Sequence, residues 1–220
     1  MDSLQHLLDA PKLLALAAAL GWASGIRLYA AVFLTGAAGF MGWIQLPHGL
    51  LILQHPGVLA ASGFMLFVEF FADKIPLVDT VWDAIHTVIR IPAGAALAAG
   101  ALGADSTAMG WIAALLGGSL AATSHAAKLT TRAAINTSPE PFSNIAMSLA
   151  EDGFVVFMLW LSATHPLLFA IALALTLVLA VVLMVVLVKF LRTVLRGLRR
   201  FLSGHGLPAG ATHVQENHRR

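Results

Sequence analysis

The sequence predicts an all-α, polytopic membrane protein in which some helices are broken or re-entrant. Hydrophobic residues make up 59% of the chain and charged residues only 11%, whereas a soluble domain carries about 25% charged residues. The run 166–188 contains no charged residue, and about 20 apolar residues are enough for a helix to cross the hydrocarbon core. Runs of this length favour helices over a barrel, because a helix satisfies its own backbone hydrogen bonds within lipid.

The first apolar segment, residues 13–44, is too long for one ordinary span. It is interrupted by Gly21, Gly25 and Arg27. Glycines beside a lone arginine predict a break between two half-helices, which a membrane tolerates only where protein or a water-filled cavity surrounds the break. The alternative interpretation is that Arg27 lies near an interface and extends its head group to water.

Residues 58–72 form the next predicted helix, and Glu69 and Asp73 share one of its faces at a spacing of four residues. Residues 77–90 then form an amphipathic helix that ends before Pro92, because the residue preceding a proline is pushed out of the helical region. Its polar residues recur along one face: Asp79, Asp83, His86 and Arg90. We expect this helix to lie near a membrane surface without spanning, with a polar face that is either solvated or lines a cavity.

The second half of the chain begins with a helix over residues 108–135, whose basic residues Lys128 and Arg132 fall on one face with His125. A helix from residue 143 or 144 to 161 follows and carries Glu151 and Asp152.

Each half therefore has a glycine-containing apolar segment with a base, followed by a helix with acids. This weak correspondence suggests an internal two-fold repeat, at about residues 11–90 and 91–165, followed by a final span over residues 166–202.

We expect one helical transmembrane domain over residues 1–202 and a disordered cytoplasmic tail over residues 203–220. Seven of the 13 Lys and Arg residues follow the last apolar run: Lys189, Arg192, Arg196, Arg199, Arg200, Arg219 and Arg220. The positive-inside rule places this end of the chain in the cytoplasm, with anionic lipid headgroups as partners of the basic helix. No other basic patch exists, so a nucleic acid partner is not expected, and the lack of cysteine excludes disulfides and thiol chemistry.

A set of ionisable residues lies within or beside the apolar segments, and it forms the candidate substrate-binding site: Arg27, Glu69, Asp73, Lys74, Arg90, Lys128, Arg132, Glu151 and Asp152. An isolated charge at the centre of a bilayer costs about 2.5–3.5 kcal/mol. Four acids against five bases therefore predict pairing across helices. We expect at least one base of the set Arg27, Lys128 and Arg132 to lie within salt-bridge distance of an acid of the set Glu69, Asp73, Glu151 and Asp152.

The leading functional hypothesis is a transporter or channel-like permease for a small polar or anionic solute, such as a lipid-linked phosphate, across the membrane. In this hypothesis the bases attract the anion, and Glu69, Asp73 and Glu151 carry coupling protons or release the solute. No cofactor is expected. The chain is compatible with a homo-oligomer.

Two alternatives remain open. One is an integral membrane enzyme in which Asp79, Asp83 and His86 hold a divalent metal; these are acceptable ligands, but three ligands from one helix leave an open site and no nucleophile motif accompanies them. The other is a structural assembly subunit in which the ion pairs only hold the helices together.

The order of several short elements carries a family resemblance over about residues 20–165. They are Gly25-Ile26-Arg27, Glu69-x3-Asp73-Lys74-x-Pro76, Arg90 followed by Ala93-Gly94-Ala95, Arg132, and Glu151-Asp152. In this order the chain resembles a family of small bacterial inner-membrane proteins known as domain of unknown function 4126. The segment between Pro76 and Arg90 contains more acid than is typical of that family, which indicates a subgroup. The resemblance implies a helical membrane domain and no established activity.

Overall fold

The computed structural model describes residues 2–75, 77–102, 107–137 and 141–203. Every regular element in these ranges is a helix, which confirms the predicted all-α class. In chain order the elements are α1 (Asp2–Phe40), the 3-10 helix η1 (His48–Gln54), α2 (Pro56–Ala72), α3 (Val78–Leu102), α4 (Thr107–Ile135), α5 (Pro141–Thr164) and α6 (Pro166–Ser203). The predicted tail lies outside the described residues except for Ser203, which ends α6.

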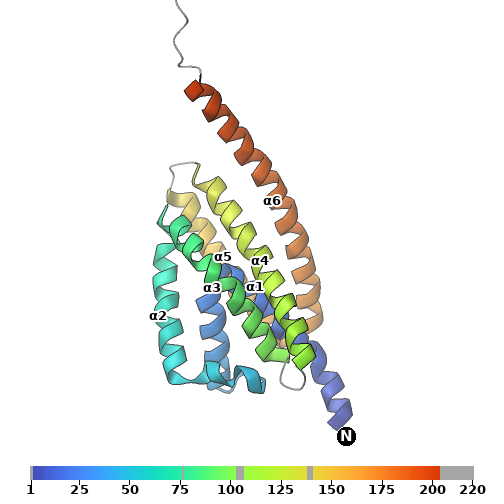
Figure 1. Cartoon of the computed structure of the whole chain (residues 1–220). Helices are drawn as coiled ribbons and strands as arrows, with labels where there is room; N and C mark the ends of the chain where they lie inside the picture. The colour runs from blue at the N-terminus through green and yellow to red at the C-terminus, as the bar shows by residue number, and fades with distance from the viewer. Residues whose placement is uncertain (1, 76, 103–106, 138–140, 204–220) are drawn as a thin grey trace, which may run out of the picture.

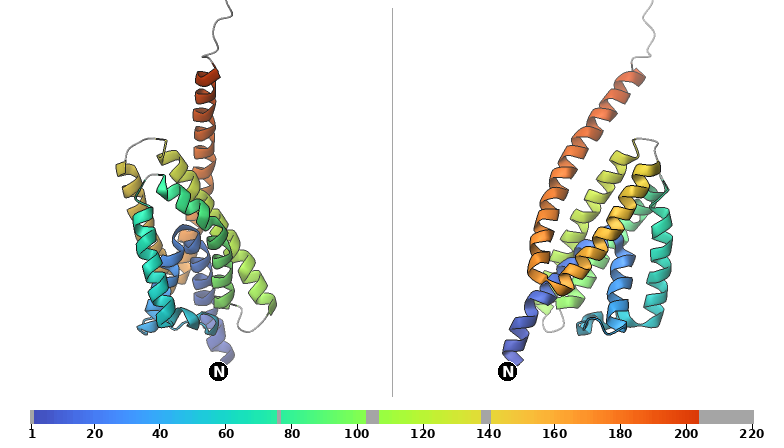
Figure 2. Two further views of the ribbon diagram at one scale, coloured as in Figure 1. Left: turned by 60° about the vertical axis from the view of Figure 1, so that its left-hand side comes forward. Right: turned by 180° about the vertical axis from the view of Figure 1, so that it is seen from behind.

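Five of these helices are long and apolar enough to cross a membrane, namely α1 and α3 to α6. Helices α2 to α6 run alternately toward opposite ends of the molecule, with α1 at the centre and α6 on the outside (Figures 1 and 2). Helix α1 packs against α3, α4 and α5, and α3 packs most extensively against α4. This arrangement confirms a multi-pass helical domain and makes α1 the helix around which the others assemble.

Helix α1 is kinked at Arg27, whose backbone is not helical (φ −142°, ψ 74°). The two halves leave the kink toward the same end of the molecule (Figure 2). A break leaves helical carbonyl groups without their usual partners, and α4 supplies replacements: His125 Nδ1 lies 3.1 Å from the Gly25 carbonyl and Lys128 Nζ lies 3.2 Å from the Ile26 carbonyl. The predicted break is therefore present, and α4 stabilises it.

Helix α3 corrects the prediction for residues 77–90. The helix does not end before Pro92 but continues to Leu102, since membrane helices tolerate proline where neighbouring groups satisfy the freed backbone. Its polar face is also not solvated, because Asp79, Asp83 and Arg90 are completely buried. The full helix is long enough to span, so the prediction of a short helix lying along the membrane surface is wrong.

The predicted two-fold repeat stays a prediction. The expected boundary between residues 90 and 91 falls inside α3. Helix α4, which the comparison of the two halves matched with α1, is a single helix from Thr107 to Ile135 without a comparable kink. The correspondence in the sequence therefore consists of the alternation of basic and acidic helices.

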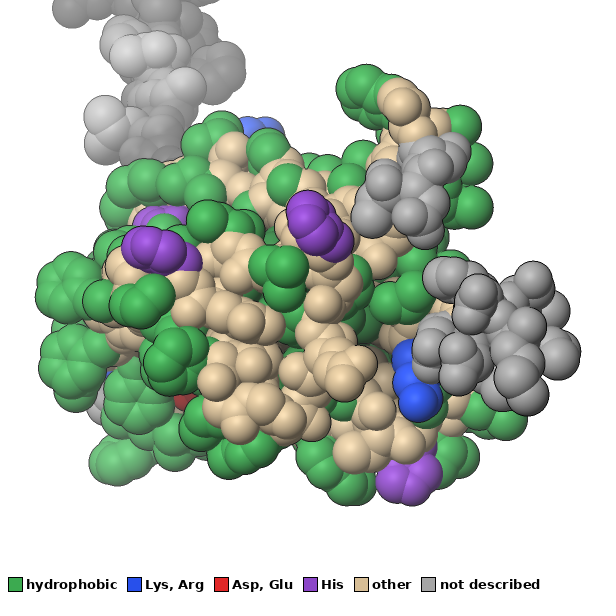
Figure 3. All heavy atoms as spheres, turned by 90° about the horizontal axis from the view of Figure 1, so that it is seen from below, with side chains coloured by type: hydrophobic (Ala, Val, Ile, Leu, Met, Phe, Trp, Pro, Cys, Tyr) green, Lys and Arg blue, Asp and Glu red, His purple; other side chains and the backbone are tan. Residues whose placement is uncertain are grey.

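The two ends of the molecule differ in charge. The far end of α6 carries exposed basic residues: Lys189, Arg192, Arg196 and Arg199. The opposite end, viewed in Figure 3, is dominated by hydrophobic and uncharged atoms, with histidines and little Lys or Arg. Such an asymmetry is what the positive-inside rule describes for the two sides of a membrane protein.

The kink leads to a prediction about sidedness. Lys12 in the N-terminal half of α1 and Met41 directly after α1 are exposed, and Phe142 at the start of α5 is 78% exposed at the other end of the bundle. Because the chain has no cysteine, single substitutions Lys12→Cys, Met41→Cys and Phe142→Cys can be labelled without background. We expect an impermeant maleimide to reach the first two from one side of the membrane and the third from the other. Labelling of the Lys12 and Met41 variants from opposite sides would show that α1 crosses.

Candidate functional site

Ionisable side chains from five helices and the α2–α3 connection form one continuous buried network. It contains the nine predicted residues together with Asp79 and Asp83. Salt bridges no longer than 4.0 Å join its members without interruption from Lys74 at one margin to Glu69 at the other. The expectation that bases and acids pair across helices is confirmed.

Asp73 is the centre of the network. It caps the C-terminus of α2, where its backbone N–H binds the Glu69 carbonyl. One carboxylate oxygen, Oδ2, accepts from Arg27 Nη1 and from Lys128 Nζ, the latter at 2.7 Å, and lies 4.0 Å from Arg132 Nη2. Burial alone raises the pKa of Asp73, but the charges of Lys128 and Arg27 outweigh burial and hold that pKa below its ordinary value. One carboxylate thus lies at the centre of a cluster of three cations at the break in α1.

A second branch extends from Lys128 to Arg90. Lys128 Nζ lies 3.0 Å from Asp83 Oδ1, and the same oxygen accepts from Arg90 Nη1 at 2.7 Å. Arg90 Nη2 lies 2.5 Å from Glu69 Oε1. Glu69, Asp83 and Arg90 are all completely buried. This branch links α2, α3 and α4 in the interior of the bundle.

A third branch is organised by Arg132 near the end of α4. Its Nη2 group lies 2.8 Å from Glu151 Oε2, and its Nη1 group donates to Asn144 Oδ1 and lies 3.9 Å from Asp79 Oδ2. Arg27 Nη2 approaches the same Glu151 oxygen at 3.6 Å. Arg132 therefore connects α5 and the start of α3 to the centre of the network.

The outer margin of the network is formed by Asp152 and Lys74. Arg27 Nε lies 2.9 Å from Asp152 Oδ1, and Lys74 Nζ lies 3.7 Å from Asp152 Oδ2. Lys74 Nζ also lies 3.0 Å from the centroid of the Phe70 ring, a cation–π contact. Side-chain exposure is 16% for Lys74 and 24% for Asp152, against none for Arg27. The network therefore reaches the surface at this point.

The three residues considered as metal ligands do not converge. Asp79 accepts from Asn136, Asp83 pairs with Arg90, and His86 contacts the Trp82 carbonyl and the Tyr29 hydroxyl at 2.8 and 3.1 Å. Within the ranges that the structure describes, no group of three or more His, Asp or Glu side chains is arranged to hold a metal ion. The structure thus places two of these residues, Asp79 and Asp83, in the ion-pair network.

The balance of charge in the network favours acids. Its five bases are Arg27, Lys74, Arg90, Lys128 and Arg132, and its six acids are Glu69, Asp73, Asp79, Asp83, Glu151 and Asp152, a difference of one negative charge. Four buried carboxylate oxygens have no hydrogen-bond partner among the described residues: Glu69 Oε2, Asp73 Oδ1, Asp83 Oδ2 and Asp152 Oδ2. A buried acceptor without a donor is unfavourable. These oxygens therefore retain unused capacity to accept a hydrogen bond.

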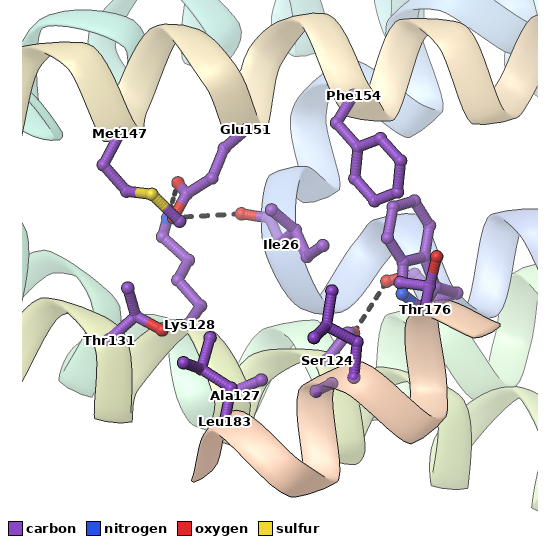
Figure 4. A pocket seen from close by; sticks show the side chains of 13 residues that line it. Ile26, Ser124, Ala127, Lys128, Thr131, Met147, Glu151, Phe154, Thr176 and Leu183 are labelled. Atoms are coloured by element: carbon purple, nitrogen blue, oxygen red, sulfur yellow. Dashed lines mark hydrogen bonds and ion pairs between the residues drawn. The ribbon is translucent and has the colours of Figure 1, made fainter. Parts of the chain in front are cut away.

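A cavity of about 190 Å³ adjoins the network between α1, α4, α5 and α6. Most of its wall is apolar. Figure 4 shows Lys128 and Glu151 pointing toward each other at one end, with Phe154 and Thr176 toward the other. The cavity thus joins a hydrocarbon-like interior to a charged end, and Lys128 belongs to both the cavity wall and the network.

Sequence reasoning missed several polar partners in the site. Asn144 and Ser148 lie on the face of α5 that carries Glu151, at spacings of seven and three residues, and Ser148 accepts a hydrogen bond from Arg27 at 2.9 Å. His125, which the sequence did place on one face with Lys128 and Arg132, contacts the Gly25 carbonyl and Thr87, and these partners were not predicted. The helical spacing relative to the charged residues was the available signal in each case.

Comparison with known proteins identifies the family of this chain. No curated protein and no solved structure is significantly similar to this chain. The model of one family, described as domain of unknown function (DUF4126), matches residues 14–186 and so covers every residue of the network. The chain therefore belongs to the DUF4126 family.

Proposed function

We propose that this protein is a multi-pass permease of the bacterial inner membrane that moves an anionic solute together with a proton, with the buried network as its site. The basic end of α6 lies in the cytoplasm, in keeping with the positive-inside rule. The observation that carries the proposal is the environment of Asp73. Its carboxylate is shared by Arg27 and Lys128 and lies near Arg132, at the break in α1.

The Asp73 carboxylate occupies the place that a solute anion would take. Arginine and lysine bind carboxylate and phosphate groups by the same charge-assisted hydrogen bonds. An anion that enters the cluster competes with Asp73 for the two cations, and protonation of Asp73 removes that competition. By linkage, the anion raises the pKa of Asp73 and the proton raises the affinity for the anion by an equal free energy. Proton and anion are thereby coupled without a further component.

The kinked helix supports this function. Broken helices in transporters place backbone groups and charges at the solute site, and they move as separate halves. In this chain the carbonyl groups before the break bind His125 and Lys128 by single side-chain contacts. Lys128 therefore takes part both in a bond that stabilises the break and in the ion pair with Asp73. A change of charge at Asp73 is transmitted directly to α1.

Proton-coupled anion flux tests the proposal. Purified protein is reconstituted into liposomes that enclose the pH dye pyranine, and an inward gradient of inorganic phosphate, sulfate or nitrate is applied. We expect acidification of the lumen that requires the anion and increases as the external pH falls. Asp73→Asn is expected to abolish the anion-dependent proton signal, because its carboxyl cannot carry the proton. Lys189→Gln, at an exposed position on α6, is the matched control and should behave as the wild type.

Two results would contradict this function. In the first, none of the three anions drives a proton signal in the wild-type protein. In the second, the Asp73→Asn variant retains the coupled signal at the wild-type rate.

A further inference from the structure

The lining of the cavity beside the network indicates which kind of anion the site would bind. We propose that the cavity binds the hydrocarbon chain of an anionic phospholipid, whose headgroup meets Lys128. This inference rests on the proposed function, since it takes the cation cluster as the anion site. It adds that the solute is an amphiphile that enters from the bilayer.

The wall of the cavity suits a hydrocarbon chain. Trp22 and Phe154 lie edge to face with ring centroids 5.3 Å apart, and Leu179 and Leu183 approach from α6. Two hydroxyl groups of the wall are already used, because Ser124 donates to the Trp22 carbonyl at 2.7 Å and Thr176 donates to the Ala172 carbonyl at 2.7 Å. A cavity with an apolar wall and few free polar groups favours apolar ligand groups over water.

The volume of the cavity is adequate for part of a chain. An apolar cavity of about 150 Å³ in another protein stays dry and accepts benzene. The present cavity measures about 190 Å³. It can therefore hold several methylene groups, while the remainder of a longer chain extends outward along α6.

The charged end of the cavity leads directly to the cation cluster. Lys128 lines the cavity, and its Nζ group lies 2.7 Å from Asp73 Oδ2. Glu151 also lines the cavity, but its carboxylate is already paired with Arg132 at 2.8 Å and lies 3.6 Å from Arg27. An anionic headgroup at this end meets Lys128 first and has both arginines beyond it. Two guanidinium groups and an ammonium group match the charge and oxygen count of a phosphate.

The outer wall of the cavity faces the membrane. Helix α6 contributes Thr176, Leu179, Ala180 and Leu183 to the wall, yet Leu179 is 65% exposed. Helix α6 packs on α4 and α5 along the outside of the bundle (Figures 1 and 2). A chain from the bilayer can therefore reach the cavity beside α6, whereas a water-soluble anion gains nothing from the apolar wall.

Quenching of Trp22 by brominated lipid tests the inference, because Trp22 lines the cavity and is almost completely buried. The assay uses full-length protein in detergent in which the other four tryptophans, Trp43, Trp82, Trp111 and Trp160, are replaced by Phe. The probes are phosphatidic acid and phosphatidylcholine with identical brominated chains. A second protein that retains only Trp111, which is 70% exposed on α4, reports the non-specific contact of each lipid with the micelle.

We expect saturable quenching of Trp22 by brominated phosphatidic acid, with an affinity about tenfold above that for phosphatidylcholine, because the headgroup of phosphatidic acid is a net anion whereas choline offsets the phosphate charge of phosphatidylcholine. Lys128→Gln should remove this preference. Ala180→Phe should abolish quenching of Trp22 by filling the cavity, and Thr176→Phe is a second filling variant if the first fails to fold. The Trp111 protein should show no such preference.

Three outcomes would overturn the inference, and they leave the proposed function to its own test. Equal quenching by both lipids would show an apolar cavity without selection for a net negative headgroup. Absence of quenching above the Trp111 control would show that no chain enters. Competition by inorganic phosphate with the affinity of phosphatidic acid would show that the chain contributes nothing, and it would leave the coupled flux of a free anion intact.

Discussion

Replacing Arg90 by methionine is expected to lower the free energy of unfolding by about 3–5 kcal/mol, the cost of removing one partner from a buried ion pair. Arg90 is completely buried and binds Glu69 and Asp83 at 2.5 and 2.7 Å. Asp83 retains Lys128 at 3.0 Å, but no other salt bridge to Glu69 is seen among the described residues. The variant therefore leaves a carboxylate uncompensated in the interior. Thermal unfolding in detergent, followed by loss of the monodisperse peak in size-exclusion chromatography, measures the change.

A double variant separates charge from packing. Glu69→Met combined with Arg90→Met removes both members of the pair and replaces them with apolar side chains of similar length. Replacement of a complete buried pair by apolar residues is often neutral, so we expect the double variant to recover most of the stability lost in Arg90→Met. Arg196→Met on the exposed face of α6 controls for loss of a positive charge. A double variant as unstable as Arg90→Met alone would show that the packing of Arg90, and not its charge, stabilises this part of the bundle.

The helical spacing of charged residues predicted much of the site. Glu69 and Asp73 are four residues apart, as are Lys128 and Arg132, so each pair was expected to leave one face of a helix. The cost of an isolated charge in lipid then required the two sets to meet. The structure shows these pairs in one network. Periodicity and desolvation energy together therefore identified which residues interact, although not the individual partners.

The same periodicity was misleading for α3. A helix with one polar and one apolar face has the same pattern whether the polar face contacts water or a buried network. In α3 the apolar residues Val81, Ile85 and Val88 are 59%, 59% and 76% exposed, whereas Asp83 is buried. The polar face points inward because the apolar face is suited to lipid. The pattern alone cannot distinguish this arrangement from a helix that lies along the surface.

The reversal of α1 also could not be predicted from local sequence. Gly25 and Arg27 indicated where the helix breaks, but the direction of the second half depends on distant groups. His125 and Lys128, about 100 residues later, bind the carbonyl groups at the break. Arg27 is held by Asp73 and Ser148 from two further helices. A break is encoded by neighbouring residues, whereas its geometry is set by tertiary contacts.

The second large effect is expected from Gly25→Val, at a close approach of α1 to α4. A Cβ atom at Gly25 would overlap the Ser124 hydroxyl and the Ala121 carbonyl oxygen, far inside van der Waals contact. The serine can rotate, but the carbonyl belongs to the α4 backbone and cannot move independently. Overpacking of this kind costs about 1–3 kcal/mol, and more where backbone must shift. Gly25→Ala should show a smaller loss in the same direction.

Separation of the two helices is also expected to disable the site. The Gly25 carbonyl binds His125 at 3.1 Å, and Lys128 on the same helix binds Asp73 at 2.7 Å. A shift of α4 away from α1 lengthens both contacts, so Gly25→Val should lose anion-dependent proton flux even in the fraction of protein that remains folded. Gly153→Ala is the matched control, because nothing lies within 4 Å of a Cβ atom at that position; it should be neutral or slightly stabilising, as expected for alanine in a helix. A Gly25→Val protein with wild-type melting temperature and flux would show that α1 and α4 do not need this contact.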